Sequence, residues 1–428
     1  MISRNQAFFA ALALTATSIL NGCVTNPVTG EQQLSLISTQ QELNLGQQQY
    51  PINQQQQGGQ YTIDPSLQEY VSRVGEKLAR VSDQPQLPYE FVVLNNSVPN
   101  AWALPGGKIA INRGLLVLLE DEAELAAVLG HEIVHAAARH SATAMSQQQV
   151  LGAGLAVLGA ATKESAYADL ISTGSQLGGS AYIARYGRGN ELESDEYGMK
   201  YMAAAGYDPQ GAVGLQRKFV ELSKGRQSNG LEALFASHPP SQSRVSANIE
   251  HSKSLPKGGV TNRDAYQKAI AQLKRDADAY ENYDDALKAA NKKQFDTALN
   301  LVRKAQKQQP KEASFFALEG DLLAQKKQFD KAHQAYDRAV QKNPALFSHW
   351  LKRGMASAQL NDYTAAERDL NRSLRYLETA YAHFYLGEVY EKQGNKQNAV
   401  KHYETAAGAG GEIGSKAQAR MQALTGKG

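Results

Sequence analysis

The run "VLGHEIVHAAARH", residues 128–140, places two histidines and a glutamate among small and apolar residues. His131 and His135 are four residues apart, so a helix puts both imidazoles on one face, one turn apart. Glu132 then lies on the flank of that face, about 100° around the helix axis. Neutral imidazoles are good zinc ligands, and a neighbouring carboxylate that is not bound to the metal can take a proton from a zinc-held water. This spacing predicts one Zn²⁺ per chain, with Glu132 as the general base.

The third ligand must come from another element, and "NELESD", residues 190–195, contains the best candidate, Glu191. Glu191 and Asp195 are also four residues apart and share a helix face. One of them can bind the metal while the other accepts a hydrogen bond from the free ring nitrogen of a ligand histidine. Glu193 falls on roughly the opposite side of that helix and is the weaker candidate. Structural zinc sites usually include cysteine, and the one cysteine of the chain is Cys23, so a structural site is disfavoured.

Hydrophobic periodicity and turn residues predict the elements that must position these side chains. The pattern predicts a helix after Asp64, a strand in "YEFVVLNN" (residues 89–96), extended segments at Ala101–Leu104 and Lys108–Asn112 joined by a Pro-Gly-Gly turn, a helix from Glu122 to about Ser141 with Asp121 and Glu124 as a capping box, and a helix that stops at Gly206. Residues 147–179 are rich in Ala, Gly and Leu, and they fit either helical hairpins or a mobile flap.

A repeat marks the carboxy-terminal part of the chain. Phe295, Phe329 and Tyr363 are each 34 residues apart, and small residues recur at fixed offsets from them. This period resembles tetratricopeptide repeats, which are pairs of helices whose small residues let neighbouring helices approach closely. Three full units with a half unit ahead of them are expected from Asp285 to about Ala407. Stacked units form a concave groove that binds peptides or partner proteins, and a structural appendage without a ligand is the alternative.

The amino-terminal residues 1–22 have the features of a signal peptide, with Arg4 followed by an apolar segment too short to span a bilayer comfortably. The sequence Leu20-Asn21-Gly22-Cys23 resembles the lipobox of bacterial lipoproteins, which implies that Cys23 is acylated. Residues 23–60, rich in Gln, Asn, Ser and Thr, are predicted to be a polar tether. The formal net charge of +3 is too small and too scattered to indicate a nucleic-acid partner.

Four stretches together resemble a family of zinc metallopeptidases that includes the prenyl-protein endopeptidase, the heat-shock membrane peptidase and periplasmic peptidases with tetratricopeptide repeats. They are "NAWALPGGKIAINRGLL", "ELAAVLGHEIVHAAARH", "RGNELESDEYG" and "SHPPSQSRV". The resemblance implies zinc ligands and a base at His131, His135, Glu191 and Glu132, with Asp195 and Arg188 supporting the site.

The same resemblance implies a role for His238, which lies in a His-Pro loop near the metal of such enzymes. His238 either donates a hydrogen bond to the oxyanion of the tetrahedral intermediate or occupies the open zinc position and holds the enzyme idle. The alternative without a role in catalysis is a histidine that is simply packed in its loop. His140 is five residues from His135 and is expected to point away from the ligand face.

The expected fold is α+β and mostly helical, with a gluzincin-like metallopeptidase domain that contains a small sheet, followed by an all-α tetratricopeptide-repeat solenoid. The expected order is a lipoprotein signal peptide (1–22), a polar tether (23–60), the zinc metallopeptidase domain (61–250), a linker helix (251–280), the repeats (281–410) and a C-terminal helix or tail (411–428).

The expected function is that of a zinc endopeptidase of the periplasm, lipid-anchored to the outer membrane. Substrate backbone is expected to add to an edge strand at Asn100–Ala103, with Asn100, Trp102 and Ala103 as substrate-binding residues. The resemblance implies protein substrates, namely outer-membrane proteins or their assembly machinery, recruited through the repeats. Two alternatives are a chaperone or assembly scaffold with a latent peptidase, and a structural lipoprotein whose metal only stabilises the fold.

Overall fold

The computed structural model describes residues 23–162, 186–224 and 231–426, with only the backbone described for 152–162. The described residues form two compact units, one within Met1–Gln56 and Asp64–Ala271 and the other within Gln57–Ile63 and Gln272–Gly428. None of the helices in these ranges combines the length and the apolar composition that crossing a bilayer requires. The predicted signal peptide, and residues 163–179 of the Ala/Gly/Leu-rich segment, lie outside the described residues.

A three-stranded sheet lies at the centre of the first unit, with β3 (Glu90–Leu94), β5 (Lys108–Asn112) and β4 (Ala101–Leu104) in that order. β4 and β5 are antiparallel, with Ala103 opposite Ile109, and β3 is parallel to β5. The predicted strand and the predicted Pro-Gly-Gly hairpin are therefore confirmed, and β4 is an edge strand. Every residue of β4 and β5 is buried, which requires cover on both faces.

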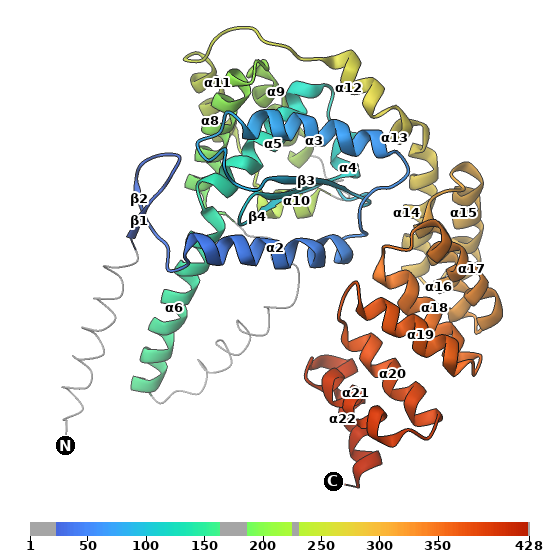
Figure 1. The fold of residues 1–428 in the computed structure, drawn as a ribbon. Helices are drawn as coiled ribbons and strands as arrows, with labels where there is room; N and C mark the ends of the chain where they lie inside the picture. Colours follow the sequence, from blue (N-terminus) through green and yellow to red (C-terminus); the bar gives the residue numbers. More distant parts are fainter. Residues whose placement is uncertain (1–22, 163–185, 225–230, 427–428) are drawn as a thin grey trace, which may run out of the picture. The chain divides into compact units, whose positions relative to one another are not determined.

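Helices cover the two faces of this sheet (Figure 1). α3 (Pro65–Ala79) and α5 (Glu122–Ala137) pack on one face, and α2 (Thr39–Gln56) runs along the other. Asp64 and Asp121 cap α3 and α5, each side chain accepting a hydrogen bond from a first-turn backbone amide. α5 ends at Ala137 rather than near Ser141, because Arg139 adopts a left-handed conformation with φ of 62°.

The segment predicted as a polar tether is instead largely folded. β1 (Cys23–Thr25) and β2 (Gln32–Leu34) form an antiparallel hairpin, and α2 follows. Tyr50 of α2 packs edge-on against Trp102, with ring centroids 6.0 Å apart, and its hydroxyl donates a 2.9 Å hydrogen bond to the Ile109 carbonyl. A few buried side chains therefore dock a helix whose composition is otherwise polar, and composition alone does not reveal that docking.

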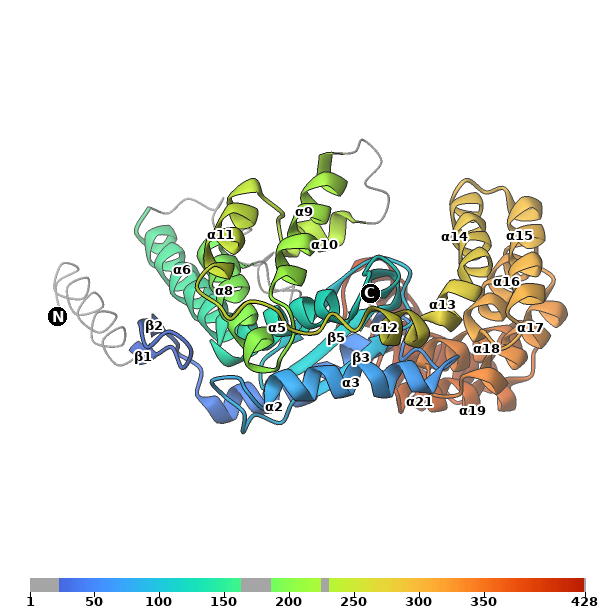
Figure 2. The same ribbon diagram turned by 90° about the horizontal axis from the view of Figure 1, so that it is seen from above.

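Further helices complete the described part of the first unit. They are α4 (Arg113–Leu116), α6 (His140–Thr162), α8 (Arg188–Ala204), α9 (Gln210–Lys224), α10 (Glu232–Ser237), α11 (Gln242–Ser252) and α12 (Arg263–Ala269). Figure 2 shows α8, α9 and α11 grouped beside α5. The helix predicted to stop at Gly206 is α8, and Gly206 has a φ of 81°. The expected linker 251–280 is partly packed into this unit, because Tyr266 is fully buried and its hydroxyl donates a 2.6 Å hydrogen bond to the Leu116 carbonyl.

The second unit confirms the helical repeats. Its helices are α13 (Ala271–Arg275), α14 (Ala277–Asn291), α15 (Phe295–Gln308), α16 (Ala313–Gln325), α17 (Phe329–Lys342), α18 (Phe347–Gln359), α19 (Tyr363–Leu374), α20 (Ala380–Lys392), α21 (Lys396–Ala407) and α22 (Gly411–Thr425). The residues of the 34-residue period begin α15, α17 and α19. Gly320 of α16 lies under the Tyr336 ring, where a Cβ would come within 2.4 Å. The expected half unit is a complete pair, α14 and α15.

Candidate metal centre

Two glycines allow the helices that carry the site to approach closely. Gly130 precedes His131 on α5 and Gly198 lies on α8, and the two face each other. A Cβ on Gly198 would lie 3.0 Å from the His131 amide nitrogen, and a Cβ on Gly130 would lie 3.1 Å from the Gly198 carbonyl oxygen. Because the backbones almost touch, short side chains on the two helices meet between them. This contact brings Glu191, 60 residues further along the chain, to His131.

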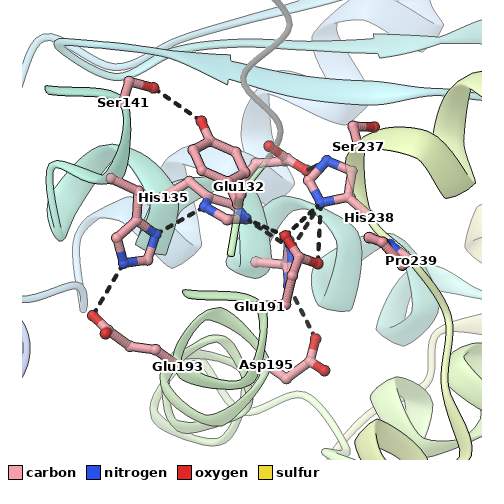
Figure 3. Close-up of polar contacts among 12 residues, drawn as sticks. Glu132, His135, Ser141, Glu191, Glu193, Asp195, Ser237, His238 and Pro239 are labelled. Carbon is pink, nitrogen blue, oxygen red and sulfur yellow. Dashed lines mark hydrogen bonds and ion pairs between the residues drawn. The ribbon is translucent and has the colours of Figure 1, made fainter. Parts of the chain in front are cut away.

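Four side chains converge at this contact, and Figure 3 labels three of them, His135, Glu191 and His238. The fourth is His131, and the ligand atoms of all four lie within 4.8 Å of one another. The Nε2 atoms of His131 and His135 are 3.0 Å apart, and His238 Nδ1 lies 3.3 Å from His131 Nε2. The Glu191 carboxylate is 3.5 Å from His131 Nε2 and 3.4 Å from His135 Nε2. The three predicted ligands are thus placed together, and His238 joins them.

Hydrogen bonding on the far side of the rings indicates what this cluster requires. His131 Nδ1 lies 3.0 Å from Asp195 Oδ1, and His135 Nδ1 lies 2.8 Å from His140 Nδ1. When each Nδ1 carries the proton of a neutral ring, both Nε2 lone pairs point at each other and at a buried carboxylate. Lone pairs converging in this way need a cation between them, and two imidazoles with a carboxylate suit zinc. The residues therefore fit the metal that the sequence predicted.

The pKa values of the cluster also favour a cation at its centre. Burial lowers the pKa of His131, but Glu191 and Asp195 outweigh burial and raise this pKa to about 10. Burial dominates at His135 and holds its pKa well below the usual value. Burial would raise the pKa of Glu191, yet His131 and His238 hold it well below the ordinary range. The site thus keeps an ionised carboxylate and favours positive charge at its centre.

Asp195 supports the ligands together with an arginine that the sequence interpretation missed. Arg244 of α11 donates hydrogen bonds of 2.7 Å to both Asp195 oxygens, and its Nη1 lies 2.8 Å from Glu191 Oε2. The side chain of Arg244 is 4% exposed, whereas Arg188, the predicted supporting arginine, is exposed at the start of α8. Arg244 lies within the matching stretch "SHPPSQSRV". The sequence therefore pointed to this segment, but it did not indicate that Arg244 pairs with Asp195.

Glu132 lies beside the ligands and remains outside their group. Its Oε1 is 3.5 Å from His238 Nε2, and its buried Oε2 has no hydrogen-bond partner among the described residues. Burial raises the pKa of Glu132, partly opposed by His238 and His131. A carboxyl group with a raised pKa and an unused oxygen next to the metal position is suited to accept and return a proton.

His140 does not point away from the ligands, contrary to expectation. It is buried between His135 and Glu193, with Glu193 Oε1 3.3 Å from His140 Nε2. Burial raises the pKa of Glu193, but His140 and Asn26 outweigh it and hold this pKa below its usual value. The helical spacing failed here because Arg139 ends α5 and turns the chain, so His140 begins a new helix.

An apolar pocket adjoins the metal position. Its lining includes Ala101, Val128, Met199, Phe219 and Leu234 together with His131 and Glu132. The Asn100 carbonyl accepts a 2.9 Å hydrogen bond from the Asn112 amide, so pairing alternates along β4 and the backbone of Ala101 and Ala103 points away from β5. Asn100 is buried, and the Trp102 side chain lies in the core cluster with Tyr50. Of the predicted substrate-binding positions, Trp102 therefore directs its side chain away from the pocket.

Comparison with known proteins places the residues of this site within a metallopeptidase family. The profile of peptidase family M48 matches residues 65–251. Metalloprotease YcaL of Escherichia coli is 32% identical over 182 residues, which cover 41% of this chain and 68% of that protein. The chain belongs to peptidase family M48. The resemblance to this family of metallopeptidases seen in the sequence is thereby confirmed.

Longer relatives match a larger share of this M48 member. The beta-barrel assembly-enhancing protease of Yersinia pestis is 26% identical over 325 residues, covering 69% of this chain and 66% of that protein. The Escherichia coli protein of the same name is 29% identical over 237 residues, which cover 54% of this chain and 47% of that protein. The chain thus spans about half to two thirds of the length of these relatives. Tetratricopeptide-repeat profiles match residues 286–362 and 351–412.

Proposed function

We propose that this M48 member is a zinc-dependent endopeptidase of the periplasm that hydrolyses peptide bonds of misfolded or stalled envelope proteins. The observation that carries the proposal is the convergence of His131, His135 and Glu191 beside an unligated Glu132. The names of its relatives, protease and assembly-enhancing protease, support the reaction and the envelope setting. The repeats would select clients, since such helical stacks commonly bind peptides or partner proteins.

The residues of the chain divide the chemistry as follows. Bound zinc supplies Lewis acidity, which makes water nucleophilic near neutral pH and polarises a carbonyl group. Glu132 accepts the proton of the attacking water and returns it to the leaving amine. The outward backbone of Ala101 and Ala103 pairs with an extended substrate, and the apolar pocket receives a side chain. Burial of the cluster excludes bulk water, which strengthens these electrostatic contacts.

The test is hydrolysis of casein by the zinc-loaded protein beside Glu132→Gln, with zinc content measured for both. We expect Glu132→Gln to retain zinc and to lose roughly 100- to 10,000-fold in rate, as removal of a general base does. Equal rates for the two proteins would contradict the proposal. Removal of zinc by a chelator should stop hydrolysis while the far-ultraviolet circular dichroism spectrum stays the same; unfolding on chelation would instead favour the structural-metal alternative.

A second candidate, a scaffold with a latent peptidase, is favoured by the position of His238. Its Nδ1 lies 3.1 Å from Glu191 Oε1 and 3.3 Å from His131 Nε2, within the ligand group. With His238 as a fourth protein ligand, a bound zinc would have no position left for water. His238 would then be a brake that must move before hydrolysis, and the repeats would act alone until it does.

Attachment to the outer membrane through Cys23 is part of the same proposal. Cys23 is exposed at the start of β1, where a lipid would not disturb the core. Growth of cells with a radiolabelled fatty acid should label the wild-type protein and leave Cys23→Ser unlabelled. Recovery of Cys23→Ser in the soluble periplasmic fraction would agree with anchoring, and recovery of both proteins there would contradict it.

A further inference from the structure

His140 is placed against a zinc ligand by the turn that ends α5. Arg139, with φ of 62°, redirects the chain, and His140 begins α6 with its side chain 2% exposed. Its Nδ1 lies 2.8 Å from His135 Nδ1. The ring nitrogen of a ligand histidine that faces away from a metal usually donates to a carboxylate or a carbonyl. Here a second imidazole takes that place.

The direction of the protons along this contact follows from the ligand side. His135 Nε2 faces His131 and Glu191, so the neutral ring carries its proton on Nδ1 and donates it to His140. His140 accepts on Nδ1 and therefore has its own proton on Nε2, which lies 3.3 Å from Glu193 Oε1. The carboxylate of Glu193 thus favours the one tautomer of His140 that can accept from His135.

The amino-terminal hairpin completes this chain of contacts. Asn26, in the turn between β1 and β2, donates a 2.9 Å hydrogen bond from Nδ2 to Glu193 Oε1. The hairpin is held in place independently, because Gln33 Nε2 donates a 2.9 Å hydrogen bond to the Ala138 carbonyl. Arg139 Nη2 also donates a 2.8 Å hydrogen bond to the Ile37 carbonyl, just beyond β2. The turn that carries His140 is therefore fastened to the segment that follows Cys23.

We infer that His140 is a positioning residue for the zinc ligand His135, and that the hairpin Cys23–Leu34 sets the affinity for zinc through Asn26 and Glu193. The inference rests on the zinc site of the proposed function. It makes the amino-terminal segment part of the metal centre. Cys23 lies three residues before Asn26, so the proposed point of membrane attachment is connected to a metal ligand through a short series of polar contacts.

The test measures zinc affinity by competition with a chromophoric chelator, in a Glu132→Gln background that prevents self-cleavage. His140→Leu should weaken zinc binding about 10- to 100-fold, the usual cost of losing such a partner. His140→Asn, whose side-chain oxygen can accept from His135, should restore most of the affinity. Glu193→Gln and Asn26→Ala should weaken binding less, and Glu196→Gln, an exposed α8 carboxylate paired with Lys200, serves as the matched control.

A second measurement is the visible absorption spectrum of the Co²⁺-loaded protein, which reports ligand geometry without any activity. Glu193→Gln should shift the d–d bands and Glu196→Gln should leave them unchanged. Wild-type affinity and spectrum in the folded variants of His140, Glu193 and Asn26 would overturn the inference. If His140→Leu does not fold, the zinc affinities and Co²⁺ spectra of Glu193→Gln and Asn26→Ala decide whether the inference holds. Failure of the wild type to bind either metal would overturn the proposed function itself.

Discussion

Arg244 holds Asp195 with two hydrogen bonds of 2.7 Å, and Asp195 in turn contacts the ligand His131. Replacing Arg244 by Gln would remove the positive charge that contacts the buried carboxylates of Asp195 and Glu191. We expect the metal-free protein to lose about 3–5 kcal/mol in unfolding free energy, the cost of breaking a buried ion pair. Urea denaturation followed by circular dichroism measures this loss.

Arg188→Gln is the matched control for that measurement, because Arg188 is an exposed arginine on the same helix as Asp195. Its unfolding free energy should change by about 0.5 kcal/mol or less, as for most surface substitutions. If Arg188→Gln lost as much unfolding free energy as Arg244→Gln, Arg188 would also support the metal ligands, as the sequence predicted.

His238→Ala tests the brake. Removing the fourth ligand opens a coordination position, so casein hydrolysis should become faster while zinc binds less tightly. Rates and zinc affinity should be measured on the same preparation. Slower hydrolysis with unchanged zinc affinity would instead assign His238 to stabilisation of the oxyanion.

Gly46→Ala tests whether α2 is docked on the sheet. A Cβ at this position would lie 1.9 Å from the Pro105 carbonyl oxygen, which belongs to the turn between β4 and β5. We expect a loss of about 1–3 kcal/mol, as for other overpacked contacts. Trp102 fluorescence in a Trp350→Phe background reports unfolding of the first unit.

The control for this variant is Gly214→Ala. Gly214 lies in α9, with no atom within 4 Å of its added Cβ. The unfolding free energy of this variant should rise by about 0.5–1 kcal/mol, since Ala has a higher helix propensity than Gly. If both variants had the stability of the wild type, α2 would not be packed against the hairpin turn.

The stability of the repeats should depend on pH through His402. Burial first, and then His383 and Lys401, lower its pKa from 6.5 to about 4, and the two histidine Nδ1 atoms are 2.9 Å apart. The unfolded chain takes up the proton first, so the stabilisation is complete above pH 6.5 and is lost as the pH falls toward 4. Thermal unfolding of the wild type and His402→Gln should show a difference that changes across this window and is constant above it. Parallel curves throughout would contradict the assigned pKa.

The hairpin at Pro105 and the repeats were predictable because their signals are local. A Pro-Gly-Gly turn joins two adjacent extended segments, and aromatic residues at a 34-residue period mark units that contact only the next unit along the chain. The docked helix α2 was not predictable in this way. Its polar composition is typical of a tether, and the contacts that hold it on the sheet, such as those of Tyr50 and Gly46, are made with residues about 60 positions away.

The sequence by itself determined the chemistry of the site. Spacings of four residues place His131 beside His135, and Glu191 beside Asp195, on their helices, because the helical repeat alone sets which side chains share a face. The tertiary structure decided which groups surround them. Arg244, His238 and Asn26 reach the site across 49 to 167 residues of chain. Such contacts depend on the path of the folded chain, which no local periodicity encodes.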